Sequence, residues 1–191
     1  MKDKLGYLEV IAGPMYSGKT EELIRQVKRA IISKKRVQVF KPSIDLRYGP
    51  EEKLYSHAGL TVDSKKIKNT GEILGLLDPK TELVFIDEAQ HMGSELVSVV
   101  QKLLQKGIWV VVAGLATTFD RQPFTPVPQL MAIADKVTKL SAICSICGAE
   151  AVFHKAVKKT KDVNALLPDP EFVKNLKSNV FEARCRMCFD K

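Results

Sequence analysis

The stretch GPMYSGKT, residues 13–20, decides the fold that this sequence adopts. Before it lies a short apolar run, YLEVIA at residues 7–12, whose β-branched side chains and following glycine are typical of a buried strand. After it, residues 20–35 repeat apolar side chains at helical spacing, which predicts an amphipathic helix. The residues of this apolar stripe are Leu23, Val27, Ile31 and Ile32. GPMYSGKT is therefore expected to form a turn from a strand into a helix.

The same stretch matches G-x-x-x-x-G-K-[ST], the phosphate-binding loop. Its glycines let backbone N–H groups converge on phosphate oxygens, and the helix N-terminus adds its positive dipole end. Lys19 can reach the β- and γ-phosphates, and the Thr20 hydroxyl can bind Mg²⁺. We therefore expect ATP and Mg²⁺ as cofactors. The residues assigned to this site are Gly13, Pro14, Met15, Tyr16, Ser17, Gly18, Lys19 and Thr20.

Length and composition limit what surrounds this loop. The 191 residues, 45% of them apolar, suit an α/β domain over residues 1–140 and a small second domain over residues 141–191. Apolar runs stay short of the roughly 18 residues that a membrane helix needs, and the polar start MKDKLG is not typical of a signal peptide. We expect a cytoplasmic protein with no membrane partner. The net charge of +8 suits nucleic acid or ATP, but the lysines are scattered, which makes nucleic acid an unlikely partner.

Apolar segments and turn signals alternate along the rest of the chain. Strands are predicted at residues 36–42, 81–90 and 108–115, and helices at residues 70–77, with Thr70 as a possible N-cap, and 93–107. Residues 129–140 predict a short helix and a strand, and the polar residues 43–66 predict a long functional loop. This alternation favours a parallel sheet covered by helices on both faces, with ligands beyond the carboxyl ends of its strands.

Acidic residues follow one of these predicted strands. In LVFIDEAQ, Asp87 is placed to hold Mg²⁺, and Gln90 is assigned with it to the cofactor site. Glu88 is the acid that activates water in an ATPase or accepts a hydroxyl proton in a kinase. Asp45 and Arg47 follow the strand at residues 36–42, and arginine is suited to stabilise charge on a transferring phosphoryl group.

All four cysteines lie in the last 48 residues, in the pairs CSIC and CRMC. Two Cys-x-x-Cys pairs are the halves of a tetrahedral zinc site, and disulfides are rare in a cytoplasmic chain. The expected ligands are Cys144, Cys147, Cys185 and Cys188. A site closed by four thiolates leaves no open position for chemistry, so we expect Zn²⁺ to be structural.

Taken together, these motifs resemble the thymidine kinases that carry a C-terminal zinc-binding lobe. The matching pieces are GPMYSGKTEEL, VFKPSIDLRY, SHAG, VFIDEAQ, AGLATTF with QPF, and the two cysteine pairs, and they span nearly the whole chain. The resemblance implies ATP-dependent phosphorylation of a deoxynucleoside 5′-hydroxyl, with thymidine the leading substrate. It also implies a homotetramer with one zinc ion per subunit.

The resemblance also implies roles for single residues. Glu88 corresponds to the catalytic base, while Lys19, Arg47 and Mg²⁺ stabilise the γ-phosphoryl group in transfer. Thr20 and Asp45 correspond to residues that hold Mg²⁺ or its waters. The base pocket corresponds to Met15, Leu115 and Phe119, closed by a lasso loop between the cysteine pairs. His57 lies in a motif of the family, and we expect it to be structural.

This chain departs from the family where the base is recognised. His91 stands where a phenylalanine is usual, Ala116 where an aspartate is usual, His154 for a threonine and Phe181 for a tyrosine. The lasso lacks its glycines and could instead form a short helix at residues 168–176. We include His154 and Phe181 in the substrate site, and expect phosphoryl transfer to be kept and base selection to be altered.

Two other functions remain compatible with these motifs. One is an ATPase that acts on nucleic acid, with Glu88 activating water and the zinc lobe gripping a backbone. The other is a protein that binds nucleotide without turnover. The first predicts ATP hydrolysis that polynucleotide stimulates and salt suppresses, and the second predicts tight binding with no transfer.

Overall fold

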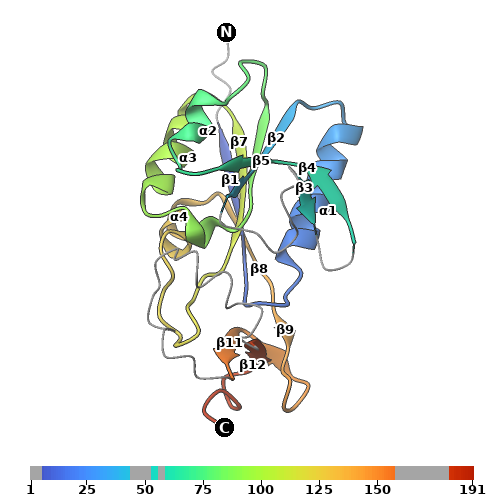
Figure 1. Ribbon diagram of the computed structural model, residues 1–191, viewed down its shortest axis with the longest axis vertical. Coiled ribbons are helices and arrows are strands. Elements are labelled where there is room, and N and C mark those ends of the chain that lie inside the picture. The colour runs from blue at the N-terminus through green and yellow to red at the C-terminus, as the bar shows by residue number, and fades with distance from the viewer. Residues whose placement is uncertain (1–5, 44–52, 56–58, 158–180) are drawn as a thin grey trace.

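The computed structural model describes residues 6–43, 53–55, 59–157 and 181–191. At its centre is a six-stranded parallel sheet with the strand order β5-β2-β6-β7-β1-β8 (Figure 1). The strands of this sheet are β1 (Tyr7–Ala12), β2 (Val37–Pro42), β5 (Lys65–Ile67), β6 (Leu83–Ile86), β7 (Trp109–Gly114) and β8 (Lys136–Lys139). The predicted α/β fold with a parallel sheet is confirmed.

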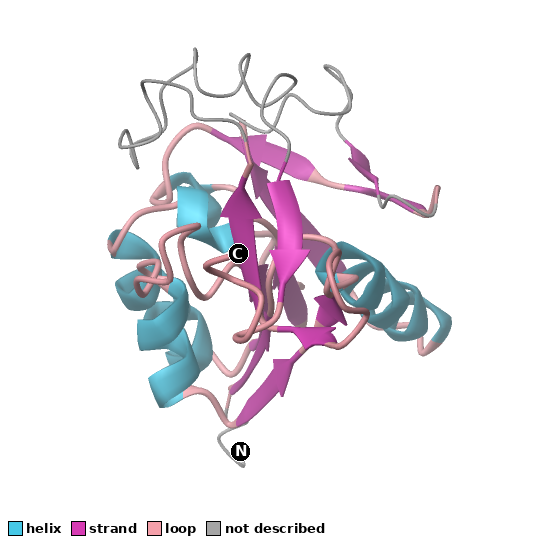
Figure 2. Cartoon of the chain, turned by 90° about the horizontal axis from the view of Figure 1, so that it is seen from below, coloured by secondary structure: helices cyan, strands magenta, loops and turns pink. Residues whose placement is uncertain are grey.

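Helices cover both faces of the sheet (Figure 2). One face packs against α2 (Glu72–Gly75), α3 (Glu95–Gln105) and α4 (Val127–Ile133), and the other packs against α1 (Lys19–Ile32). Successive side chains of a strand point to opposite faces, so Val10 joins the first core and Ile11 the second. Because both faces are buried, the central strands β1, β6 and β7 carry almost continuous apolar runs.

The helix after the phosphate loop packs through fewer of its predicted residues than expected. Leu23 and Val27 are buried, but Ile31 is 52% exposed and Ile32 is 80% exposed. Ile32 lies about 180° around the helix from Leu23, because each residue turns the helix by roughly 100°. Ile31 lies in the last turn of α1. The buried face is completed instead by Ile24 and Ala30, so the prediction for Ile31 and Ile32 was wrong.

The polar residues 43–66 are not simply a loop. Their described part contains β3 (Lys53–Tyr55) and β4 (Thr61–Asp63), which pair as an antiparallel hairpin. It also contains the start of β5, which pairs with β2 at the edge of the sheet. The side chain of Leu54 is buried in the core beside α1. Buried Leu54 in β3 and partly buried Val62 in β4 therefore attach this hairpin to the core, although the composition of the segment is polar.

Thr70 does not cap α2, contrary to the prediction. Its hydroxyl donates a hydrogen bond to the carbonyl of Met92, which ties the start of α2 to the segment before α3. The backbone N–H of Glu72 is instead accepted by the Asn69 side chain, with Oδ1 at 3.2 Å. The N-cap position of α2 is Gly71, which has no side chain to cap the helix, so Asn69 supplies a local side-chain acceptor just before it.

The chain beyond β8 forms two small antiparallel ribbons. β9 (Ala142–Ile143) pairs with β10 (Glu150–Ala151), and β11 (Phe153–Ala156) pairs with β12 (Phe181–Arg184). These ribbons lie together at the end of the molecule opposite the N-terminus (Figure 1). The helix expected at residues 168–176 lies outside the described residues. None of the described helices is long and apolar enough to span a membrane.

Candidate active site

The phosphate loop connects the end of β1 to the start of α1, as its pattern predicts. Gly18 has φ 79° at the helix start, a conformation that side chains rarely adopt. A Cβ added to Gly13 would lie 2.7 Å from the carbonyl oxygen of Leu140, so the chain after β8 packs directly on the loop. The ammonium group of Lys19 donates to the Pro14 carbonyl at 2.6 Å, so it lies across the loop. Backbone and lysine thus surround the place where a phosphate group fits.

Oxygen ligands for a divalent cation meet beside this loop. Thr20 Oγ1 donates a hydrogen bond to Asp87 Oδ2 at 3.0 Å, and the Asp87 side chain is 2% exposed. The carboxyl ends of β1 and β6 flank β7, which brings the two residues to one edge of the sheet. A hydroxyl and a carboxylate are ligands that suit Mg²⁺, which prefers oxygen and keeps several waters. Their chemistry fits the expected Mg²⁺ site.

Glu88 follows β6 in a left-handed conformation, with φ 52° and ψ 41°. This conformation is uncommon for a residue with a side chain and turns the chain into the short 3-10 helix η1 (Ala89–His91). The amide of Gln90 donates to the Glu88 carboxylate. Its Oε1 accepts the backbone N–H of Leu115 at 3.0 Å, at the end of β7. The position of Glu88 is therefore tied to the neighbouring strand.

The sequence assigned Gln90 to the cofactor site, which stays a prediction, and it did not predict that Gln90 contacts Glu88 and Leu115. Gln90 is 4% exposed, and its side-chain amide hydrogen-bonds both the Glu88 carboxylate and the Leu115 backbone. A Cβ on Gly114 would lie 2.9 Å from Gln90 Oε1, so the amide fills the space that glycine leaves. Only the position of Gln90, two residues after Glu88, offered a signal, and spacing alone does not define a side-chain direction.

The residues predicted to recognise the base come from two parts of the chain. Leu115 and Phe119 are half-buried in the turns that follow β7. His154 and Phe181 come from β11 and β12, and their ring centroids lie 6.1 Å apart in an edge-to-face contact. The predicted pair is therefore brought together from positions 27 residues apart in the chain.

For the remaining predicted residues, the structure gives burial or a single contact, and some of them lie outside the described residues. Met15 is half-buried in the phosphate loop, and Tyr16 is 56% exposed there. His91, from η1, makes an edge-to-face contact with Phe124 at 6.3 Å between ring centroids. The residues of the predicted set that lie outside the described residues are Asp45, Arg47 and His57.

The environment of His154 changes its protonation. The side chain is 3% exposed, and burial together with the positive charge of Lys19 lowers the pKa of His154 from 6.5 to about 4. Burial is the larger cause. The imidazole is therefore neutral at physiological pH.

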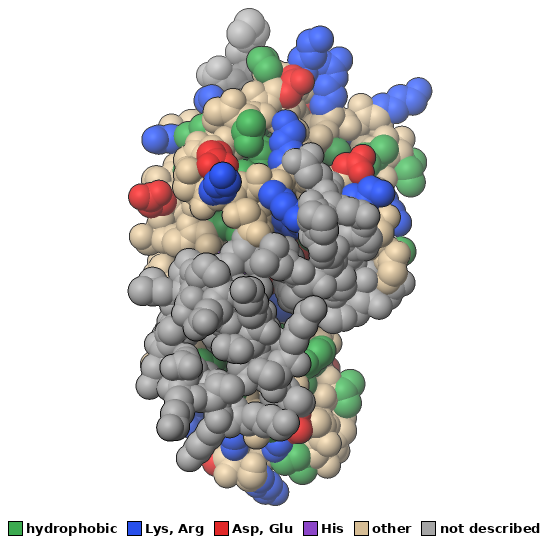
Figure 3. All heavy atoms as spheres, viewed as in Figure 1, with side chains coloured by type: hydrophobic (Ala, Val, Ile, Leu, Met, Phe, Trp, Pro, Cys, Tyr) green, Lys and Arg blue, Asp and Glu red, His purple; other side chains and the backbone are tan. Residues whose placement is uncertain are grey.

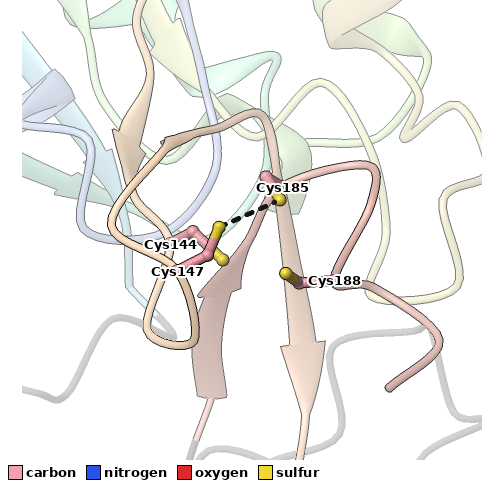
Figure 4. Close-up of side chains that lie close together, drawn as sticks. All are labelled: Cys144, Cys147, Cys185 and Cys188. Atoms are coloured by element: carbon pink, nitrogen blue, oxygen red, sulfur yellow. Dashed lines mark hydrogen bonds between the residues drawn. The ribbon is translucent and has the colours of Figure 1, made fainter.

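The four cysteines gather between the two small ribbons (Figure 4). Their sulfur atoms all lie within 4.8 Å of one another, and Cys147 Sγ is 3.6 Å from Cys185 Sγ. Four sulfurs at about 2.3 Å from a zinc ion lie roughly 3.8 Å apart in a tetrahedron. The cluster of Cys144, Cys147, Cys185 and Cys188 therefore has the size of the predicted site.

The thiols of this cluster titrate unequally. The pKa of Cys144 is lowered to about 6, mainly by a hydrogen bond from the backbone of Cys185. The pKa of Cys188 is raised to about 12, mainly by a hydrogen bond with the Cys147 side chain. Four thiolates so close together repel one another unless a divalent cation lies between them. Both the size and the donor set fit Zn²⁺.

Comparisons with known proteins identify a family model and individual proteins that this chain resembles. The family model described as thymidine kinase matches residues 6–189. A thymidine kinase of Bdellovibrio bacteriovorus is 49% identical over 146 residues, which make up 76% of this chain and 71% of that protein. Among solved structures, the crystal structure of the pilus retraction motor PilT with bound ADP has a TM-score of 0.47 and 14% sequence identity. That match covers 90% of this chain and 52% of the motor chain.

Proposed function

Because the chain belongs to the thymidine kinase family, we propose that it transfers the γ-phosphoryl group of ATP to the 5′-hydroxyl of a deoxynucleoside, with thymidine the leading substrate. The observation that supports this most is the placement of Glu88. Its carboxylate is held by Gln90 at the edge of the sheet where Lys19 and the Thr20–Asp87 pair also lie. Family membership does not favour the alternative of an ATPase that acts on nucleic acid.

In this proposal each residue has one task. Backbone N–H groups of residues 13–20 bind the phosphates, and Lys19 leaves the Pro14 carbonyl to bind the β- and γ-phosphates. Thr20 and Asp87 hold Mg²⁺ or its waters, and Asp45 joins them. Bound Mg²⁺ neutralises charge on the phosphate oxygens.

The γ-phosphoryl group is then transferred in one displacement. Glu88 accepts the proton of the 5′-hydroxyl as the nucleoside oxygen forms its bond to the γ-phosphorus. The bond from that phosphorus to the bridging oxygen breaks, so the products are ADP and the nucleoside monophosphate. Arg47 stabilises charge on the transferring group.

The substrate and zinc assignments follow the same premise. Met15, Leu115, Phe119, His154 and Phe181 line the base pocket in this proposal. Zn²⁺ binds the four cysteines and holds the small ribbons together.

We also propose a homotetramer, on the family resemblance alone. We likewise propose a cytoplasmic location, because zinc-binding thiolates are kept reduced there. On the face seen in Figure 3, Lys and Arg are interspersed with Asp and Glu in the described part, and no basic stripe for nucleic acid is visible there.

The proposal is tested by product analysis. The purified protein is incubated with ATP, Mg²⁺ and each of thymidine, deoxyuridine, deoxycytidine, deoxyadenosine and deoxyguanosine, and ADP and monophosphate are measured separately. We expect equal amounts of both products with at least one pyrimidine deoxynucleoside. ADP formed without monophosphate would identify an ATPase, and neither product would identify a protein that binds nucleotide without turnover.

A further inference from the structure

Arg121 joins the part of the chain around the central sheet to the C-terminal ribbons. It lies in the turns after β7, and its guanidinium carbon stacks 4.4 Å from the centre of the Phe189 ring. Its Nη1 also lies 3.4 Å from the Asp190 carboxylate, so one arginine contacts two successive residues near the end of the chain. Phe189 directly follows Cys188, which the sequence assigns to the zinc site. Arg121 is therefore fastened beside the cysteine cluster.

The Phe189 ring is a fixed support for this contact. Phe189 is 6% exposed, and its ring meets Phe153 of β11 edge to face, with centroids 5.7 Å apart. Lys155 of β11 donates a hydrogen bond from its ammonium group to the Phe189 carbonyl at 2.6 Å. The Asp190 side chain, by contrast, is 75% exposed, and exposed ion pairs contribute little to stability. Stacking of the guanidinium group on the aromatic ring is therefore the stronger half of the contact.

The turn that carries Arg121, residues 116–124, is closed by its own hydrogen bonds. The Thr118 backbone N–H donates to the Gln122 carbonyl at 2.8 Å, and the Arg121 N–H donates to the Thr118 carbonyl at 3.1 Å. A further backbone hydrogen bond of 3.0 Å joins the first and last residues of the turn. Phe119, which is predicted to line the base pocket, lies inside this closed turn. Because the turn is closed in this way, fixing Arg121 also fixes Phe119.

The backbone of Arg121 shows that this position is constrained. Its φ is 68°, in the left-handed region that residues with side chains rarely adopt. Glycine suits that conformation better, and a strained residue persists only where the surrounding structure holds it. The contact with Phe189 accounts for an arginine at this position, because the turn by itself gains nothing from a guanidinium group.

The other end of the turn is anchored at the edge of the sheet where Glu88 lies. Leu115 directly precedes the turn, and its N–H donates to Gln90 Oε1 at 3.0 Å. The Gln90 amide in turn donates to the Glu88 carboxylate. This anchor remains when the stacking contact is lost, so the chain would move at Phe119 more than at Glu88. The consequence is a change in nucleoside binding with little change in the chemical step.

We propose that Arg121 is a positioning residue of the nucleoside site: by stacking on Phe189 it fastens the turn to the C-terminal ribbons and thereby sets the place of Phe119. This inference rests on the proposed function, because it needs a nucleoside beside that turn. Arg121 itself touches no substrate in this account. It acts through Phe119, so its effect falls on the affinity for the nucleoside and not on the affinity for ATP.

Four substitutions separate the stacking, the ion pair and the conformation of the turn. Arg121→Gly removes the side chain and suits the left-handed backbone, whereas Arg121→Lys keeps the charge and loses the planar group. Phe189→Leu removes the aromatic face and keeps an apolar side chain, and Asp190→Asn removes only the ion pair. The control is Arg186→Ala, because that guanidinium group lies 5.1 Å from the centre of the Phe153 ring, within the C-terminal ribbons.

The measurements on each purified full-length variant are KM for the nucleoside, KM for ATP, kcat, bound zinc and the thermal midpoint of unfolding. In Arg121→Gly, KM for the nucleoside should rise roughly 3- to 20-fold, because the stacking contact is lost. KM for ATP and kcat should stay within about twofold, and bound zinc should match the wild type. Arg121→Lys should lie between the wild type and Arg121→Gly, while Asp190→Asn and Arg186→Ala should behave like the wild type.

A double variant shows whether the two residues act as one contact. Phe189→Leu should give the same rise in nucleoside KM with ATP KM unchanged. Arg121→Gly combined with Phe189→Leu should lose no more than the larger single loss, because each change removes the same contact. Losses that multiply would mean that the residues act separately, and would overturn the inference.

Two further results would overturn it. One is an unchanged nucleoside KM in Arg121→Gly. The other is a lower thermal midpoint of unfolding with equal rises in both KM values, which would assign Arg121 to the general stability of the fold.

Failure of this inference is distinguishable from failure of the proposed function. Binding of each of the five deoxynucleosides is measured by calorimetry with a non-hydrolysable ATP analogue, beside the transfer assay. If the wild type binds a nucleoside without transferring phosphate, the proposed function fails and the variants still report on binding. If the wild type transfers phosphate and Arg121→Gly binds the nucleoside equally well, only the inference fails. If the wild type binds none of them, both fail.

Discussion

Thr20 Oγ1 donates a hydrogen bond to Asp87 Oδ2 at 3.0 Å, which joins two motifs that are 67 residues apart in the chain. Because the hydroxyl uses its O–H to donate this hydrogen bond, the lone pairs of Thr20 Oγ1 remain available to a cation. The buried carboxylate is thereby held in place before any metal binds. This pair links the phosphate loop to the acidic segment that carries Glu88.

Thr20→Val should therefore weaken the use of Mg²⁺. Valine has nearly the shape of threonine but offers no oxygen ligand, and it removes the hydrogen bond that orients Asp87. We expect the Mg²⁺ concentration for half-maximal activity to rise about 10- to 100-fold. A Mg²⁺ titration at saturating ATP measures this, and Thr20→Ser, which keeps the hydroxyl, is the matched control. Equal Mg²⁺ dependence in the valine and serine variants would contradict the assignment.

Gln90 positions Glu88, so Gln90→Leu should lower kcat selectively. Leucine fills a similar volume but cannot bond the Glu88 carboxylate or the Leu115 N–H. A small displacement of the base costs up to about 10²-fold, and we expect kcat to fall roughly 10- to 100-fold with KM for ATP little changed. Steady-state kinetics with each substrate varied measures this. Gln101→Leu, on the exposed side of α3, is the control. A loss confined to KM for ATP would assign Gln90 to cofactor binding instead.

Removal of zinc should loosen the C-terminal ribbons. Structural zinc sites contribute directly to folding free energy, so a chelator or Cys185→Ser should lower the thermal midpoint of unfolding and abolish bound zinc. Metal analysis of the wild type should give one zinc ion per chain. Met187→Ser alters an 82% exposed residue within the second cysteine pair and should keep the metal. Full zinc content in Cys185→Ser would contradict a site made by four cysteines.

The buried imidazole of His154 makes stability depend on pH. Its folded pKa of about 4 lies below the unfolded value of 6.5, so between these values the unfolded chain binds the proton and the folded chain does not. The free energy of unfolding should therefore fall as the pH drops from 6.5 to 4, by about 3 kcal/mol from this group. Urea denaturation of the wild type and His154→Phe at pH 7 and pH 5 measures it. Parallel losses in both proteins would contradict the assignment.

Much of this site could be predicted from sequence, because its motifs are local. A phosphate loop is contiguous, so Gly13 to Thr20 specify their own turn, and each cysteine pair is one tight turn. Residues that act across the sheet were harder to predict. The link from Gln90 to Leu115 and the hydrogen bond from Thr70 to Met92 depend on tertiary packing, which neither periodicity nor spacing encodes. The short strands β3 and β4 were missed because their composition is polar and their pairing is local to one hairpin.

The same limit explains the error in α1. The apolar pattern predicted the correct helix. Ile32 was assigned to the buried stripe although its spacing from Leu23 places it on the opposite side, and the pattern does not show that the last turn, which holds Ile31, is left uncovered. Ile31 and Ile32 are apolar yet exposed, and Ala30 is buried in their place. Sequence alone therefore predicted the helix α1 and left open which of its terminal residues are covered.

The most direct test of the account is the rate of phosphoryl transfer in Glu88→Gln. Glutamine keeps the size of the side chain and cannot accept the 5′-hydroxyl proton, so kcat for nucleoside phosphorylation should fall about 10²- to 10⁴-fold. ATP binding should be kept, and Glu95→Gln, an exposed residue at the start of α3, should leave the rate unchanged. A Glu88→Gln enzyme that forms nucleoside monophosphate at the wild-type rate would contradict the central claim.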